Sequence, residues 1–286
     1  MSHAVNIGGD AVGASVARGI RLFTWCAFVL AAGQTPSQAG VRRVEPAEVL
    51  PIEQIDPSVR ETVAEVIRDN TFHRRGEAET FPCNPRLYLA LLSEPTLTLA
   101  LWKDLSDNPV RLRRIAPNRF VGTDGAGANA SWDIVLRTPQ IHVFLSNLDY
   151  DSPRGKTHLE ARIVLIVRTS YFKEPSGSPW IQHDVEAYVK VDSRGWKAVA
   201  RSFRPVLENL LEDQVREAGS FISLMGRLVE SHPDWARGVV TEHAEIEPSL
   251  RTRFVALVEK IRKPNASHER PALADAAPPT TTLRRR

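Results

Sequence analysis

Trp180-Ile181-Gln182-His183-Asp184-Val185-Glu186-Ala187-Tyr188-Val189-Lys190-Val191-Asp192 is the stretch that decides the fold. Apart from His183, its odd positions are apolar, whereas its even positions are polar or aromatic. A period of two predicts a strand with one buried and one wetter face. Residues 158–171 alternate in the same way and lie a short, Pro- and Gly-containing turn away. The two stretches therefore predict consecutive antiparallel strands.

The residues before this pair continue the pattern and predict a meander of antiparallel strands. A strand near Glu77–Phe81 is expected first, and alternation resumes after Val110. Gly125-Ala126-Gly127-Ala128-Asn129-Ala130 fits a loose dinucleotide-binding pattern, but a strand follows it where that motif needs a helix. It is therefore interpreted as a glycine-bearing hairpin turn. We expect two sets of residues to face the core. They are Trp132, Ile134 and Leu136 in one strand, and Ile141, Val143, Leu145 and Asn147 in the next.

The sequence predicts helices at five places. Pro57–Arg68 predicts a short helix, and Asn84-Pro85 and Pro95 begin two more, because proline favours the first helical position. The longest helix begins at Pro205 and stops before Pro233, about 28 residues or ~42 Å, which is enough to cross a sheet. A last helix is expected at Ser249–Ile261. The apolar stripe of the long helix comprises Leu207, Leu210, Leu211, Val215, Ala218, Ile222, Met225, Leu228 and Val229.

The N-terminus has the order of a secretory signal. Arg18 and Arg21 precede the apolar run Leu22–Ala32, and small residues follow as far as Gly40. We expect cleavage after Ala32 or Ala39 and an exported protein, periplasmic or secreted, or an anchored one if cleavage fails. The predicted organisation has five parts. They are a signal peptide (1–39), a linker with a short helix (40–76), the main domain (77–233), a helical extension (234–263) and a disordered tail (264–286).

The predicted fold class is α+β, a curved antiparallel sheet wrapped around a long C-terminal helix. This order resembles the START-like superfamily of polyketide cyclase and lipid-transport proteins, the SRPBCC or helix-grip fold. The resemblance covers roughly 77–232 and concerns topology, because no diagnostic motif accompanies it. The residues that carry it are Glu79-Thr80-Phe81-Pro82-Cys83-Asn84-Pro85, the strands 158–171 and 180–192, and Phe203-Arg204-Pro205-Val206-Leu207. The resemblance implies an apolar cavity between the sheet and the long helix that begins at Pro205.

Composition and motifs exclude several classes of function. The net charge is +3, and acidic residues separate the basic ones except at Arg111, Arg113 and Arg114, so nucleic acid is not an expected partner. Removal of the signal leaves Cys83 as the one cysteine, which excludes an intramolecular disulfide and a cysteine-based zinc site. The histidine spacing contains no HExxH motif, and no G-x-S-x-G elbow is present. We therefore expect no metal, no cofactor and no catalytic residue.

His183 is the main candidate for a ligand contact, because it is the polar residue on an otherwise apolar strand face. Its alternative interpretation is a core histidine that is hydrogen-bonded to the protein. His142 and His158 are expected on outward faces, and Asp184 and Glu186 on an outward face that does not sequester them. The candidate ligand-binding residues are His183, Trp132, Asn147, Thr169 and Tyr171.

Three functions remain open from the sequence. The first is an extracytoplasmic protein that binds an apolar small molecule or lipid in the cavity, with peripheral membrane contact left open. The second is a non-catalytic interaction or structural module with a filled core, whose loops 149–157 and 173–179 would contact a partner. The third is a cyclase- or hydrolase-like enzyme that uses His183 and a second polar group beside it. Cavity volume separates the first two, and the ligand and the oligomeric state are not predicted.

Overall fold

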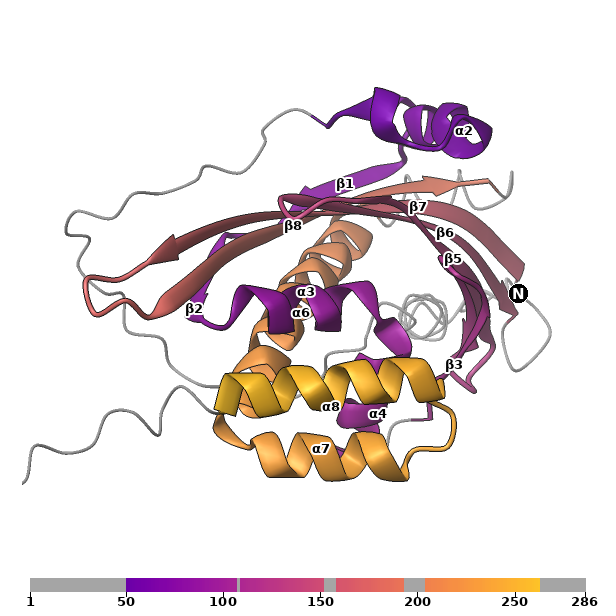
Figure 1. Cartoon of the computed structure of the whole chain (residues 1–286). Helices are drawn as coiled ribbons and strands as arrows, with labels where there is room; N and C mark the ends of the chain where they lie inside the picture. The colour runs from indigo at the N-terminus through magenta and orange to yellow at the C-terminus, as the bar shows by residue number, and fades with distance from the viewer. Residues whose placement is uncertain (1–49, 107–108, 152–157, 193–203, 263–286) are drawn as a thin grey trace, which may run out of the picture.

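The structure is a computed structural model that describes residues 50–106, 109–151, 158–192 and 204–262, without the side chains of 204–211 and 214. It is an α+β fold in which a curved antiparallel sheet holds the long helix α6 (Arg204–Ser231) on its concave side (Figure 1). The predicted fold class is thereby confirmed. The expected signal peptide, the linker up to residue 49 and the expected tail lie outside the described residues, as do the side chains of Leu207, Leu210 and Leu211.

Eight strands form one sheet in the order β1-β8-β7-β6-β5-β4-β3, and β2 also pairs with β8. All pairings are antiparallel, as the meander predicts. The turn between β4 and β5 contains Gly125 and Gly127, both with positive φ, so the glycine motif is a hairpin turn as expected. The strands are β1 (Phe72–Arg75), β2 (Glu79–Pro82), β3 (Arg111–Ala116), β4 (Arg119–Thr123), β5 (Ala128–Arg137), β6 (Ile141–Asp151), β7 (His158–Lys173) and β8 (Pro179–Val191).

Capping residues and prolines fix the helix starts. The Asp56 carboxylate accepts a hydrogen bond from the Ser58 amide at 2.8 Å, and the Asn84 side chain accepts one from the Arg86 amide at 2.9 Å. Pro233 separates α6 from a helix that the sequence pattern did not reveal, α7. Besides the 3-10 turn η2 (Ile52–Gln54) and α6, the helices are α2 (Pro57–Arg68), α3 (Pro85–Ser93), α4 (Pro95–Leu105), α7 (Pro233–Glu242) and α8 (Pro248–Arg262).

Helices cover both faces of the sheet. Helix α2 lies on the convex face, whereas α3, α4 and α6 lie on the concave side (Figure 1). Helices α7 and α8 pack against each other, and α7 also packs against α4. The main core lies on the concave side, and its members include the buried odd positions of β7 and β8. A second core lies between α2 and the convex face. Its buried members are Ile55, Val63, Val66, Leu136, Ile141, Val143, Leu145, Val164 and Ile166.

The second core corrects the expected orientation of β6. Ile141, Val143 and Leu145 were expected to face the long helix, but they pack in the convex-side core with the residues of α2. The concave face of β6 is instead made by its even positions, which include Phe144 and Leu148. Both faces of β6 are apolar, so a period of two does not say which face meets which helix. In β5 a bulge between Ile134 and Leu136 sends Ile134 into the main core and Leu136 into the convex-side core.

Candidate functional site

A cavity of about 150 Å³ lies between the concave face of the sheet and helices α3, α4 and α6. Its walls are aliphatic and aromatic, with the polar side chains of Thr98, Ser146 and His183 among them. Strands β3 to β8 each contribute to it. The lining residues are Leu91, Leu92, Pro95, Thr98, Leu112, Phe120, Trp132, Phe144, Ser146, Ile163, Leu165, Val167, His183, Val185, Ala218, Phe221 and Ile222.

His183 is held at the cavity wall by a buried chain of hydrogen bonds. Its Nδ1 lies 3.0 Å from the Tyr88 hydroxyl, which in turn lies 2.9 Å from the Thr169 hydroxyl. Thr169 and His183 are opposite residues in the β7–β8 register, so the sheet sets their separation, and α3 brings Tyr88 to both. Burial raises the pKa of Tyr88 far above its ordinary value, which keeps the phenol protonated. The ring of His183 is therefore positioned by protein groups.

The other ring nitrogen of His183 faces a carboxylate. Nε2 lies 3.9 Å from Oε2 of Glu79 on β2, which is beyond hydrogen-bond distance, and neither atom has a hydrogen-bond partner among the described residues. The second Glu79 oxygen accepts a hydrogen bond from Ser223 of α6 at 2.6 Å. Burial acts to raise the pKa of Glu79, but His183, Ser223 and Arg227 outweigh it and hold the pKa below its ordinary value. Glu79 thus stays ionised beside the imidazole.

Ser146 is a polar group of the cavity that the sequence did not indicate. It is 3% exposed and lines the cavity, and no hydrogen bond joins its hydroxyl to the residues that the structure describes. The Thr98 hydroxyl, by contrast, donates to the Leu91 carbonyl oxygen at 2.6 Å. A hydroxyl at a cavity wall that has no protein partner is one that a ligand or a water can satisfy. Ser146 would have been found if the concave face of β6 had been assigned to its even positions.

The predicted ligand-binding residues fall into three groups. His183 and Trp132 line the cavity. Thr169 is fully buried, and Tyr171 packs edge-on against the Tyr88 ring at 6.4 Å and donates its hydroxyl to the Pro139 carbonyl oxygen at 2.6 Å. Neither residue lines the cavity. Asn147 is exposed, and its amide lies 3.4 Å from the Ser131 hydroxyl. Its expected inward orientation was wrong, because the odd positions of β6 face the convex side.

His142 also corrects the expected face of β6. It is fully buried, and its Nε2 lies 3.2 Å from the Ser93 hydroxyl at the end of α3. Burial, with a contribution from the charge of Arg137, lowers the pKa of His142 from 6.5 to about 4. His142 is therefore neutral at physiological pH, and it does not line the cavity.

Asp184 and Glu186 do lie on the convex face, but they are sequestered there, contrary to expectation. Their exposed fractions are 6% and 5%, and Arg168 between them is 5% exposed. Nη1 of Arg168 donates to Glu186 at 2.5 Å, and Arg75 donates two hydrogen bonds of 3.0 Å to Asp184. Burial acts to raise the pKa of Glu186, but His73, Arg168 and Tyr188 outweigh it and hold the pKa below its ordinary value. Both carboxylates are therefore engaged in structural ion pairs.

Two further features bear on function. His158 is exposed, as expected, and its ligand atoms and those of Asp149 and Asp151 lie within 4.8 Å of one another. Exposed groups of this kind are common without a metal ion. No helix within the described ranges combines the length and the apolar character that crossing a membrane requires.

No protein-family model matches the sequence, and no curated protein sequence matches it. Solved structures give loose likenesses. A conserved protein from Geobacillus kaustophilus is 12% identical and aligns over 54% of this chain and 96% of its own, with a TM-score of 0.35. Ara h 8.0201 is 13% identical and aligns over 50% of this chain and 96% of its own, with a TM-score of 0.27. The terminal oxygenase of carbazole 1,9a-dioxygenase from Novosphingobium sp. KA1 is 12% identical and aligns over 76% of this chain and 61% of its own, with a TM-score of 0.28.

Proposed function

We propose that this domain binds a small apolar molecule in the cavity between the concave face of the sheet and α6. The observation that carries the proposal is the cavity itself, about 150 Å³ with largely apolar walls. An engineered apolar cavity of about this size in another protein binds benzene, whereas pockets for drug-sized ligands measure about 300–1,000 Å³. The proposed ligand is therefore a one-ring or short-chain molecule, smaller than a two-chain lipid.

The arrangement of elements supports the proposed place of the chain in the START-like superfamily. Helix α6 lies on the concave side of an antiparallel sheet, with α3 and α4 between β2 and β3 in the chain, which is the order that the resemblance requires. Export is part of the proposal and is supported by Arg18, Arg21 and the apolar run after them. N-terminal sequencing of the protein from its native host tests it, and an intact Met1 in a cytosolic fraction would contradict it.

The two other functions receive less support. A filled core is expected to leave no space of this size between sheet and helix. An enzyme that uses His183 needs a ring nitrogen that can reach the substrate, but Nδ1 bonds to Tyr88 and Nε2 faces Glu79. The hydrogen bond to Tyr88 thus holds His183 in place, and the Glu79 carboxylate stands on the side to which Nε2 points. This favours a binding site whose histidine contributes shape over one whose histidine transfers protons.

Calorimetric titration with benzene, toluene and indole tests the proposal. We expect benzene and toluene to bind the wild type and the bicyclic indole to bind much more weakly. Ile222→Ala enlarges the cavity from the α6 side and should admit indole. Leu224→Ala is the matched control, because Leu224 is a partly buried residue of the same helix that does not line the cavity. Absence of heat with all three compounds, for the wild type and for Ile222→Ala, would contradict the proposal.

A further inference from the structure

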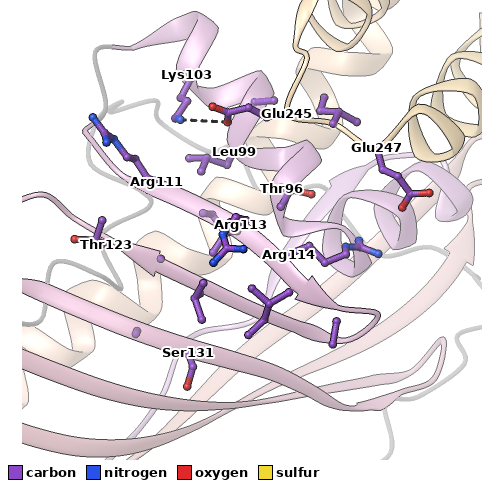
Figure 2. Close-up of a pocket in the computed structure, with 18 of the residues that line it drawn as sticks. Thr96, Leu99, Lys103, Arg111, Arg113, Arg114, Thr123, Ser131, Glu245 and Glu247 are labelled. Atoms are coloured by element: carbon purple, nitrogen blue, oxygen red, sulfur yellow. Dashed lines mark ion pairs between the residues drawn. The ribbon is translucent and has the colours of Figure 1, made fainter.

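A second hollow, a groove of about 1420 Å³, follows the edge strand β3 (Figure 2). One wall is the whole of β3, and the opposite wall comes from α4 and from the turn between α7 and α8. Thr96, Leu99 and Lys103 belong to α4, and Glu245 and Glu247 to the turn. The groove is much larger than the cavity, so it can accommodate a polymer segment.

The backbone of β3 is open on the side away from β4. In the described sheet β3 is the terminal strand, and β4 is the one strand with which it pairs. Arg111, Arg113, Ile115 and Ala116 are exposed. A terminal strand presents a row of unpaired N–H and C=O groups that can pair with another extended chain. The strand is therefore a template for adding one more strand.

Two guanidinium groups of the groove have no ion-pair partner among the described residues. No ion pair involves Arg111 or Arg113 among the residues that the structure describes, whereas the acidic residues of the groove have partners. Glu245 lies 4.0 Å from Nζ of Lys103, as the dashed line in Figure 2 marks, and Asp149 lies 3.5 Å from Nδ1 of His158. Glu247, on the wall opposite β3, accepts a hydrogen bond from the neutral Ser249 hydroxyl and keeps its negative charge. Two unpaired guanidinium groups thus remain for a ligand.

The spacing of the two arginines fits an extended peptide. Arg111 and Arg113 occupy alternate positions of one strand, so they are about 7 Å apart on the same face. Carboxylates at alternate positions of an added strand would lie opposite them, and opposite charges that face each other across strands stabilise the pairing. A second copy of β3 in a centred antiparallel register would instead place Arg113 opposite Arg113 or Arg114, which disfavours this edge as a homodimer contact.

We infer that the β3 edge binds an extended acidic peptide as an additional strand, with Arg111 and Arg113 pairing to its alternate carboxylates. Backbone hydrogen bonds supply the affinity in this mode of recognition, and side-chain contacts supply the selectivity. The partner is defined by that chemistry, an extended segment with acidic residues at every second position. Residues of this kind on a flexible terminus or loop of another protein would meet the requirement.

Fluorescence anisotropy with a fluorescein-labelled ten-residue peptide of alternating Glu and Thr tests this inference. We expect saturable binding to the full chain that weakens with salt. The double variant Arg111→Gln/Arg113→Gln should raise the Kd at least tenfold. Arg86→Gln, at an exposed arginine of α3, should leave it unchanged. Both variants change exposed residues, and unchanged thermal melting would verify that they fold.

Three control probes separate strand addition from other binding. The same composition arranged as a block of Thr followed by a block of Glu should bind at least fivefold more weakly, because the carboxylates no longer alternate. The alternating peptide with N-methylated backbone amides should not bind, since it cannot pair with the strand edge. Equal affinity for a ten-residue oligothymidylate or for the N-methylated peptide would overturn the inference in favour of a general polyanion surface. Absence of binding by the alternating peptide would overturn it outright.

Discussion

The Tyr88 hydroxyl lies 3.0 Å from Nδ1 of His183, and this buried hydrogen bond ties helix α3 to strand β8 at the cavity wall. The sequence left two interpretations of His183 open, a ligand contact or a core histidine bonded to the protein. The partner is a protein group, which corresponds to the core interpretation, yet the histidine also lines a cavity. His183 is thus a structural residue of the cavity wall, and the hydroxyl left for a ligand is that of Ser146.

The first prediction concerns this hydrogen bond. Tyr88→Phe removes a hydroxyl that serves both His183 and Thr169 and leaves two buried polar groups without their partner, so we expect a loss of about 1–3 kcal/mol in the free energy of unfolding. Tyr171→Phe removes a hydroxyl in an exposed hydrogen bond and should cost less than ~0.5 kcal/mol. Urea denaturation of the two variants measures both. Equal losses of stability would show that the buried hydrogen bonds of Tyr88 stabilise the fold no more than the exposed one of Tyr171.

The site could be predicted only where the two faces of a strand differ clearly in polarity. In β8 the even positions are mostly polar, so His183 was correctly placed inside. In β6 both faces are apolar, and the pattern alone did not identify the face that carries Ser146. The predicted helix Pro57–Arg68 held the missing signal. Its apolar side needs an apolar surface to cover, and Ile141, Val143 and Leu145 provide it.

Two elements were missed because their sequence signals are weak or shared. Strand β1 is four residues long and carries His73, Arg74 and Arg75, so its composition favours a loop. It exists because the edge of β8 offers it backbone hydrogen bonds. Pro233 was interpreted only as the end of the long helix, whereas the same proline occupies the first position of α7. Tertiary pairing and a shared boundary residue are not visible in local periodicity.

The second prediction concerns the ion pairs on the convex face. Arg168→Leu leaves Asp184 and Glu186 buried without their central cation, and breaking a buried pair in this way costs about 3 kcal/mol. Arg119→Leu breaks an exposed pair with Asp133 and should cost less than ~1 kcal/mol. Guanidinium denaturation of both variants gives the comparison. A loss under ~1 kcal/mol for Arg168→Leu would mean that Arg75 and His73 suffice for the two carboxylates.

The third prediction is a pH dependence from His142. Its pKa is lowered from 6.5 to about 4 in the fold, so the unfolded chain binds more protons between these values. The contribution of neutral His142 is therefore complete above pH 6.5 and is lost as the pH falls toward 4, by about 3 kcal/mol. His142→Gln should flatten this part of the stability profile. Urea denaturation at pH 7 and pH 4.5 measures it, and parallel profiles for the two proteins would contradict the prediction.

The fourth prediction concerns the packing of α6 on the start of α3. A Cβ at Gly226 would lie 2.9 Å from the buried Sγ of Cys83, so Gly226→Ala should destabilise the fold by about 1–3 kcal/mol. In a Cys83→Ala background the obstacle is gone, since the next neighbours are 3.7 Å and 3.8 Å away. There the better helix propensity of alanine should make Gly226→Ala stabilising, by up to ~1 kcal/mol. A double-mutant cycle measures the coupling, and additive effects would contradict the close approach.

The last prediction concerns the Ser146 hydroxyl and the polarity of the ligand. The hydroxyl is buried in the cavity without a protein partner among the described residues, so a ligand hydroxyl can satisfy it and phenol should bind more tightly than benzene. Ser146→Ala should weaken phenol about tenfold, leave benzene unchanged and cost little stability, because no protein hydrogen bond is broken. Thr98→Val is the control. Its hydroxyl bonds to the Leu91 carbonyl oxygen, so its loss should lower stability by about 1 kcal/mol without changing the ratio of phenol to benzene affinity. Calorimetric titration with both compounds gives that ratio. If Ser146→Ala left the ratio of phenol to benzene affinity unchanged, the ligand would not contact this hydroxyl, even if benzene binds in the cavity.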